Sequence, residues 1–551
     1  MEVDLTKQEI IKIEGRFLRG DLSQDLKGPK NKVSNPSSEL LKFHGIYQGL
    51  DRDKKREEKK WEFMARLRLP AGRIKAKQLL SLFPLVDQYG NGTLRATTRE
   101  SIQFHGIAKG NLKKHIQKIN DALLNTMGAC GDVVRNVMAP PAPLKDYRYE
   151  KILQDALTLS DHFYPKTRAY HELWLDGEEL RSSEAEPLYG KSYLPRKFKM
   201  AITLPEDNSV DVLSNDCAII AIFKKNKLLG YNLAIGGGMG MSHNNPNTYP
   251  RLASPFFFVG PDDLISAVEG IVKVHRDYGD RTNRKHARLK YLVEEKGTAW
   301  VKEKFKNYYK GETFDYVNHP PFKIPDHTGL HSQGDGLWYF GLPLASGRIQ
   351  GPVKSAIEEI LRAFGSDVIF TPDQNIIFCH LKKEDHPNVL KILKKWDVQT
   401  PDQLTTLDKK FMTCVALPSC GKALAEAERV RGQLLKKVEE KWLQHFCKGK
   451  KLSLRLVGCP NGCARPYSSE IGLVGRLPGI YSLYLGGNWE GTRLNTKVFD
   501  QVPFHQIPDV LDELFKVYKY SSHEFFGDFC FNLGTPALKD IILKRFPNLR
   551  M

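Results

Sequence analysis

The sequence GCPNGCARP, residues 458–466, carries two cysteines, Cys459 and Cys463, on either side of a tight Pro-Asn-Gly turn. A second pair lies upstream in TCVALPSC, residues 413–420, where five residues separate Cys414 from Cys420. Structural zinc sites favour gaps of two to four residues within a pair, so the upstream pair fits zinc poorly. Four thiolates with looser spacing suit an iron–sulfur cluster. The alternative is that these are separate buried cysteines, which is our interpretation for the remaining cysteines of the chain.

The segments around these cysteines predict how they are brought together. LSLRLVG (452–458) has the apolar pattern of a strand that leads into Cys459, and the turn at 460–462 lets Cys463 point back alongside it. The stretch 421–446 predicts a long amphipathic helix that begins directly after Cys420. The positive end of that helix dipole would lie beside Cys420 and favour an anionic centre.

Short internal repeats divide the chain into two related halves. LPAGRI (69–74) matches LASGRI (344–349), and YNLAIGGG (231–238) matches YSLYLGGN (481–488). Their order, A–B–A′–B′, makes coincidence improbable and indicates duplication. Alternating apolar strands beside amphipathic helices predict an α+β fold, duplicated around a pseudo-twofold axis that leaves room for a large cofactor. The predicted units are an N-terminal arm (1–65), a first α/β unit (66–127), a second unit (128–328), the partner of the first (329–401) and a final unit (402–551).

The composition limits the possible partners and location. The 551 residues carry a net charge of +19, and their mean hydropathy is −0.42. No run of about 18 consecutive apolar residues occurs, so we expect no membrane span. The N-terminus lacks a signal-peptide pattern, and nine cysteines are too sparse for a disulfide framework, so we expect a cytoplasmic location. Nucleic acid is the usual partner of a basic protein, but these charges are scattered and no nucleic-acid module accompanies them. We therefore expect a small polyanion bound inside the protein, and no nucleic acid.

Two stretches contain cations that could face such a ligand. In TLRATTRESIQFHG (93–106), taken as one strand, Arg95, Arg99, Gln103 and His105 alternate onto one face. Four polar groups on one face would be wasteful in a core without a polar ligand, although a single buried histidine is common. RTNRKHARLKY (281–291) carries six basic residues, a pattern typical of a solvated helix face or an RNA-binding patch.

The cysteine pattern C-x5-C and C-x3-C, written here as TCVALPSC and GCPNGCAR, resembles that of the sulfite and nitrite reductase family. Within that family the chain is most similar to the haemoprotein subunit of assimilatory sulfite reductase. The resemblance implies ferredoxin-like repeats at 66–127 and 329–401, and two α/β domains, at 128–328 and 402–551, that bind sirohaem and a 4Fe–4S cluster. It extends over nearly the whole chain through RFLRG (16–20), FHGIYQ (43–48), RLPAG (68–72), QFHGI (103–107), RNV (135–137) and YLPRKFK (193–199).

The resemblance also implies the residues of the site. The 4Fe–4S cluster is held by Cys414, Cys420, Cys459 and Cys463, and Cys463 is the thiolate shared with the sirohaem iron. The implied contacts to the sirohaem are Arg95, Arg99, Gln103, His105, Arg281, Asn283, Lys285 and Arg288. The implied substrate-binding cations are Arg68, Arg135, Lys197 and Lys199. The Gly-rich stretches 235–240 and 485–491 lack the context of a dinucleotide site, so we expect neither NAD(P)H nor flavin in this chain.

The two lysines bear on the choice of substrate. Lys197 and Lys199 are two residues apart, so on a strand both would face one cavity; an ordinary basic strand edge is the alternative. Nitrite reductases of this fold typically carry asparagine at the position of Lys199, and four cations suit dianionic sulfite. The resemblance therefore implies six-electron reduction of sulfite to sulfide, in sulfate assimilation and cysteine biosynthesis. Sirohaem-dependent reduction of nitrite to ammonia is one alternative, and an iron–sulfur protein that binds nucleic acid is another. The implied partners are sulfite and an electron donor, either an NADPH-oxidising flavoprotein or ferredoxin.

Overall fold

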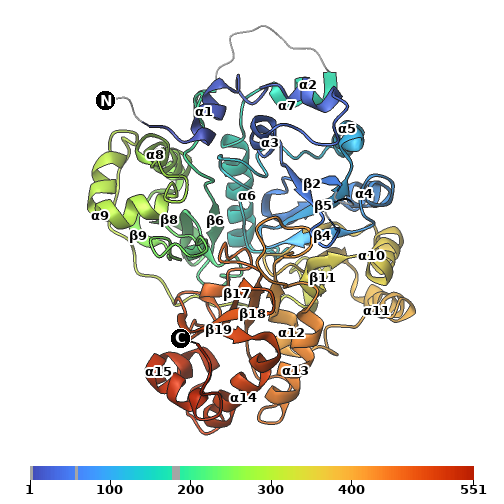
Figure 1. The fold of residues 1–551 in the computed structure, drawn as a ribbon, viewed down its shortest axis with the longest axis vertical. Helices are drawn as coiled ribbons and strands as arrows, with labels where there is room; N and C mark the ends of the chain where they lie inside the picture. The colour runs from blue at the N-terminus through green and yellow to red at the C-terminus, as the bar shows by residue number, and fades with distance from the viewer. Residues whose placement is uncertain (1–3, 56, 58–59, 177–185, 551) are drawn as a thin grey trace.

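The computed structural model describes residues 4–55, 57, 60–176 and 186–550. Figure 1 shows three regions: two central sheets coloured blue and yellow, a green lobe formed by the second predicted unit, and a red C-terminal lobe. Helix α6 (Tyr147–His162) runs between the green lobe and the blue sheet. The N-terminal helices α1 (Lys7–Glu14), α2 (Leu22–Lys27) and α3 (Asn35–Leu41) lie at one end of the molecule, away from the red lobe. No helix in these described ranges is long and apolar enough to cross a membrane.

The two central sheets share the same construction. The first has the order β1-β2-β5-β4-β12 and the second the order β10-β11-β14-β13-β3. The strands of the first are β1 (Ile46–Leu50), β2 (Trp61–Arg66), β5 (Ser101–Ile107), β4 (Leu94–Thr97) and β12 (Arg348–Ile349). Those of the second are β10 (Gly329–Ser332), β11 (Trp338–Leu342), β14 (Ile376–Leu381), β13 (Val368–Phe370) and β3 (Arg73–Ile74). Their helices are α4 (Ala76–Tyr89) and α5 (Leu112–Asp121) in one half, and α10 (Gly351–Phe364) and α11 (His386–Lys395) in the other.

Each central sheet ends in a strand from the other half of the chain. β3 pairs with β13, and β12 pairs with β4, so the two repeats exchange their short LPAGRI and LASGRI strands. The exchange needs glycine at two equivalent turns. A Cβ on Gly72 would lie 2.1 Å from the carbonyl oxygen of Phe370, and one on Gly347 would lie 2.3 Å from that of Ala96. Both glycines also have φ near +70°, which a side chain disfavours.

The other two sheets repeat one another as well. The sheet of the green lobe has the order β6 (Met200–Thr203), β7 (Cys217–Lys224), β8 (Lys227–Ile235) and β9 (Ser254–Val259). The sheet of the red lobe has the order β15 (Met412–Thr413), β16 (Leu454–Val457), β17 (Ile471–Leu477), β18 (Ile480–Leu485) and β19 (Thr496–Pro503). β6–β7 and β16–β17 are parallel pairs, and each is followed by antiparallel strands. An isolated parallel bridge from Met138 to Ala201 takes the place of β15, so Met138 corresponds to Met412. The remaining helices are α7 (Ala169–His171), α8 (Leu264–Tyr278), α9 (Leu289–Phe305), α12 (Thr406–Lys410), α13 (Arg431–Leu443), α14 (Ile507–Tyr518) and α15 (Phe526–Leu543).

Three local predictions differ from the structure. The predicted helix over 421–446 is wrong at its start, because α13 begins at Arg431 and turns occupy 421–430. The dipole of α13 therefore does not begin beside Cys420. The stretch 93–106 is a hairpin of β4 and β5 rather than one strand, because Glu100 takes left-handed backbone with φ +52° in the turn. The boundary predicted at residue 65 falls inside β2, and β1 within the predicted arm is the edge strand of the first sheet.

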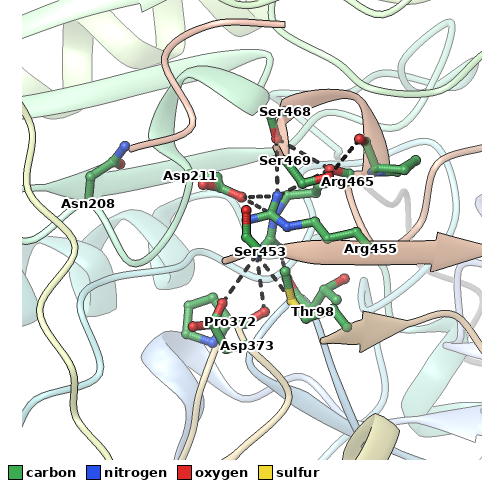
Figure 2. A network of polar contacts seen from close by, with 12 residues as sticks. Thr98, Asn208, Asp211, Pro372, Asp373, Ser453, Arg455, Arg465, Ser468 and Ser469 are labelled. Atoms are coloured by element: carbon green, nitrogen blue, oxygen red, sulfur yellow. Dashed lines mark hydrogen bonds and ion pairs between the residues drawn. The ribbon is translucent and has the colours of Figure 1, made fainter. Parts of the chain in front are cut away.

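A buried ion network joins the lobes where the two halves meet (Figure 2). Asp211, from the green lobe, accepts hydrogen bonds from Arg455 and Arg465 of the red lobe. Arg465 also donates to the carbonyl oxygens of Thr98 and Pro372, which lie in the hairpin turns of the two central sheets. One arginine thus contacts all four sheet-containing units around the centre of the molecule.

Candidate functional site

A cavity opens where the green and red lobes meet the first central sheet. Both halves of the chain line it, so neither half forms the cavity alone. Five of its lining residues are basic, one is a cysteine and two are glycines. Its lining includes Thr98, Arg99, Lys197, Lys199, Asn215, Gly240, Arg288, Asn461, Gly462, Cys463 and Arg465.

Lys197 and Lys199 both reach this cavity, as their spacing predicts. Between them Phe198 is fully buried, and its main chain bonds to Val133 and Arg135, which holds the segment extended. Burial lowers the pKa of both lysines well below its ordinary value, and neighbouring cations lower it further. Among these cations, Lys199 lowers the pKa of Lys197 most, and Arg99 lowers the pKa of Lys199 most. A cavity lined by this many basic side chains favours an anionic occupant.

The four predicted cysteines lie close enough to affect one another electrostatically. After burial, the charge of Cys463 also raises the pKa of Cys414, Cys420 and Cys459. Of the four, Cys463 is exposed and lines the cavity. Gly462 has φ +62°, and a Cβ there would lie 3.0 Å from the Met239 carbonyl oxygen, so the turn before Cys463 requires glycine.

Main-chain N–H groups point at three of these sulfur atoms. The Gly458 N–H donates to Cys414 Sγ at 3.2 Å, the Asn461 N–H to Cys459, and the N–H groups of Lys422 and Ala423 to Cys420. Hydrogen bonds of this kind stabilise thiolates and tune iron–sulfur centres. Burial raises the pKa of Cys459 to about 12 and also raises that of Cys414, so both are thiols until a bound metal replaces the proton on sulfur.

A row of polar side chains crosses the first central sheet toward the cysteines. Arg66 on β2 lies opposite Gln103 on β5, Gln103 lies opposite Arg95 on β4, and Arg95 lies opposite Arg348 on β12. With its amide oxygen turned toward Arg66, Gln103 accepts from Arg66 Nε at 2.8 Å. Cys463 acts electrostatically on both Arg66 and Arg95. The hairpin thus brings Arg95 and Gln103 onto one face by cross-strand pairing.

His105 and Arg99 extend this polar region in different directions. His105 lies two residues beyond Gln103 on the same face of β5, and burial together with Arg348, Arg95 and Arg66 lowers its pKa well below the ordinary value. Its imidazole is therefore neutral. Arg99 lies in the hairpin turn instead, where it lines the cavity and donates to Asn215 Oδ1 at 2.6 Å and to the Met200 carbonyl at 3.1 Å.

Family models and curated relatives match this chain. The model described as "Nitrite and sulphite reductase 4Fe-4S domain" matches residues 155–313, and "Nitrite/Sulfite reductase ferredoxin-like half domain" matches 55–122 and 330–396. A "Sulfite reductase (ferredoxin)" of Synechococcus elongatus is 40% identical over 564 residues, covering 97% of this chain and 90% of that protein. A "Sulfite reductase (NADPH) hemoprotein beta-component" of Myxococcus xanthus is 39% identical, covering 97% of this chain and 98% of that protein. The chain belongs to the nitrite and sulphite reductase family.

A solved structure has the same fold over nearly the same length. The NirA protein of Mycobacterium tuberculosis aligns with a TM-score of 0.80 at 22% identity, covering 97% of each chain. The family predicted from the cysteine pattern and the duplicated α+β fold are both confirmed.

Members of this reductase family use a sirohaem and a 4Fe–4S cluster, and the residues of this chain fit both groups. Within the described ranges no three His, Cys, Asp or Glu side chains converge on a point suited to one metal ion. The four cysteines lie near enough to affect one another electrostatically, and the N–H donors suit thiolate ligands of an iron–sulfur cluster. The arginines around the cavity suit a ligand with many carboxylates.

The structure does not bring Arg68 to the cavity. Its guanidinium donates to the carbonyl oxygens of Val134 and Ser160, at 3.3 and 2.8 Å, and stacks over the ring of Tyr164. Arg66 faces the site instead: burial lowers its pKa, but Cys130, Tyr47 and Cys463 outweigh burial and raise it. Sequence reasoning missed Arg66, because its cross-strand register with Gln103 is set by the folded sheet.

The other predicted cations divide into two groups. Arg135 is buried, donates to Gly131 and Ala129 carbonyls, and adds its charge to the surroundings of Lys197. Arg288 lines the cavity and pairs with Asp216. Arg281 instead binds Glu9 of the N-terminal helix and the Tyr193 carbonyl oxygen. Asn283 and Lys285 lie in an exposed turn, where the Asn283 side chain accepts from the Lys285 N–H. Of the four residues predicted in 281–291, the structure brings only Arg288 to the cavity.

Proposed function

We propose that this chain is the haemoprotein of an assimilatory sulfite reductase, which reduces sulfite to sulfide with six electrons. The observation that supports this most directly is the pair Lys197 and Lys199, which reaches the cavity lined by Cys463. Two relatives aligned over nearly the whole chain are named as sulfite reductases. Their names differ in the donor, ferredoxin in one and NADPH in the other, so the partner we propose is an electron-donor protein.

The substrate is held by cations from three segments. In this proposal Lys197, Lys199, Arg135 and Arg66 bind the oxygens of the anion. Arginine suits this task because its guanidinium stays charged and can bind two oxygens at once. Arg66 replaces Arg68 in this proposal, since Arg68 is bonded to main chain beside α6.

The lysines also supply protons. Reduction of sulfite consumes several protons as oxygen leaves, and a lysine with a lowered pKa releases its ammonium proton more easily. Burial and the neighbouring cations lower the pKa of both Lys197 and Lys199. The rigid segment around Phe198 keeps both ammonium groups on the substrate side.

Two further sets of residues hold the cofactors in this proposal. Cys414, Cys420, Cys459 and Cys463 ligate the 4Fe–4S cluster, and Cys463 is shared with the sirohaem. The sirohaem, when bound, supplies the iron that takes the anion and the electrons that reduce it. In this proposal its carboxylates are bound by Arg99 and Arg288, which line the cavity, and by Arg95, Gln103 and His105 on the first central sheet. Arg281, Asn283 and Lys285 have no place in this set, because their contacts lie with the N-terminal helix and an exposed turn.

The proposal is tested with protein purified from a host that makes sirohaem. A low-potential chemical donor replaces the protein donor, and sulfide from sulfite is measured beside ammonia from nitrite. We expect coloured protein that contains both cofactors and favours sulfite. Colourless protein that contains only zinc would overturn the proposal, and a preference for nitrite would move it to the other branch of the family.

A further inference from the structure

Glu100 is a buried acid in the turn that forms one wall of the cavity. It follows Thr98 and Arg99, which line the cavity, and Thr98 Oγ1 donates to the Cys463 carbonyl oxygen at 2.9 Å. Glu100 itself is 0% exposed and takes left-handed backbone, so its side chain points into the core. The same three-residue turn therefore contacts the site on one side and the core on the other.

One oxygen of the Glu100 side chain has a partner and the other has none. Oε2 accepts the Ala139 N–H at 3.2 Å. Oε1 is fully buried and has no hydrogen-bond partner among the residues the structure describes. A buried carboxylate oxygen without a hydrogen bond costs free energy of folding. The protonation state of Oε1 therefore has to be considered.

The second half of the chain contains the same turn with glutamine in place of the acid. Gln374 has left-handed backbone, as Glu100 does, and it precedes β14 as Glu100 precedes β5. Its Oε1 accepts the Thr413 N–H at 3.3 Å, and its Nε2 donates to the Ser346 carbonyl oxygen at 3.2 Å. Thr413 follows Met412 as Ala139 follows Met138, so the accepted bond is the same in both halves.

The hydrogen bond that Gln374 donates to Ser346 also has an equivalent position in the first half of the chain. Ser346 corresponds to Ala71, since each precedes the glycine of an exchanged strand and has φ of 55° and 50°. The Cβ of Glu100 lies 3.2 Å from the Cβ position at Gly72, and that of Gln374 lies 3.0 Å from the one at Gly347. Glu100 Oε1 therefore takes the position of Gln374 Nε2, which is a donor facing a carbonyl oxygen.

We propose that Glu100 is held as the neutral carboxylic acid, and that its Oε1–H donates to the Ala71 carbonyl oxygen as the Gln374 amide does to Ser346. In this role Glu100 is a positioning residue: it ties the turn carrying Thr98 and Arg99 to the exchanged strand β3. Its proton supplies the donor that glutamine supplies in the other half.

The charges around Glu100 agree with a retained proton. Burial raises its pKa well above the ordinary value, although the Ala139 N–H and the charges of Arg99, Arg73 and Arg465 act in the opposite direction. These three arginines come from the turn itself, the exchanged strand and the red lobe. Two of them have other partners, since Arg99 binds Asn215 and Arg465 binds Asp211, and the charge of Asp367 also acts on Arg73.

The protonation state is tested by infrared spectroscopy on the holoenzyme near neutral pH, with isotope-labelled glutamate. We expect a carbonyl band of a protonated carboxylic acid that shifts with the label and is absent in Glu100→Gln. Identical spectra in this region for wild type and Glu100→Gln would overturn the proposal. This measurement needs no turnover, so its result is independent of whether sulfite is the substrate.

The positioning role rests on the proposed function only through the use of sulfite as the probe. Glu100→Gln keeps both hydrogen bonds and should keep KM for sulfite within about twofold of wild type, whereas Glu100→Ala should raise KM about tenfold, with a smaller change in kcat. At alkaline pH the wild type should lose sulfite affinity relative to Glu100→Gln, which has no proton to lose. Equal pH profiles, or equal damage from both substitutions, would exclude the positioning role. If Glu100→Ala does not fold, the pH comparison with Glu100→Gln decides alone.

Discussion

Asp211 and Arg465 occupy equivalent positions in the two halves of the chain, and they form a buried ion pair with each other. Each precedes a short helix, Val212–Ser214 or Pro466–Ser468, and each has left-handed backbone, with φ of 47° and 55°. In a symmetric dimer of one half, identical residues would face each other at this point. Duplication within one chain allowed opposite charges here, and the pair now joins the green lobe to the red lobe.

Asp211→Asn should destabilise the protein strongly. The substitution removes the carboxylate between Arg455 and Arg465, whose side chains are only 8% and 7% exposed. Loss of one partner from a buried ion pair costs about 3–5 kcal/mol. Thermal and denaturant unfolding of the purified holoprotein would measure it. Asp87→Asn is the matched control: it removes an exposed partner of Lys354 and should cost about 1 kcal/mol or less. Equal losses in the two variants would contradict the importance of the buried network.

Lys199→Asn should change the substrate preference. Loss of one charged contact in a poorly solvated cavity should lower sulfite turnover roughly ten- to a thousandfold and nitrite turnover much less. Cofactor content should survive, since other residues are assigned to the sirohaem. The ratio of sulfite to nitrite activity, with a chemical donor, is the measurement. Lys285→Asn is the control, because Lys285 is exposed outside the cavity and the ratio should not change. An unchanged ratio in Lys199→Asn at full haem loading would remove the main support for sulfite.

Arg66→Met should lower activity, whereas Arg68→Met should lower stability. Arg66 acts on Cys463 and binds Gln103, so its loss should lower kcat/KM for sulfite about ten- to a thousandfold. Arg68 binds Val134, Ser160 and the ring of Tyr164, so its loss should lower the unfolding temperature and change kcat/KM less than about threefold in the folded protein. The reverse pattern would restore Arg68 as the substrate-binding arginine.

Cys463→Ser should remove the coupled metal centre. Cys463 is the cysteine that lines the cavity and acts on the other three. Iron and acid-labile sulfide per chain, with the visible spectrum, report the loss. Cys447→Ser is the control, since Cys447 is exposed and lies outside both cysteine pairs, and its iron content should match wild type. Full iron content and an unchanged spectrum in Cys463→Ser would refute its assignment.

Local sequence determined the family and the duplication. Cysteine spacing depends only on neighbouring residues, so the two pairs were visible without a structure. The period of two along an extended segment placed Lys197 and Lys199 on one side of Phe198, and the structure brings both to the cavity. The repeats at LPAGRI and LASGRI indicated two equivalent halves, and the matching sheet orders have this form.

Only the tertiary structure decided which cations lie at the cavity and which lie elsewhere. Arg66 and Arg68 have the same spacing as the two lysines, but strand β2 ends between them and the chain turns Arg68 toward α6. Arg281 and Arg288 share one basic stretch, yet one binds the N-terminal helix and the other the cavity. The exchange of β3 and β12 and the pairing of Asp211 with Arg465 also join residues hundreds of positions apart. Periodicity reports which residues share a face of one element, whereas what that face meets depends on how distant elements pack.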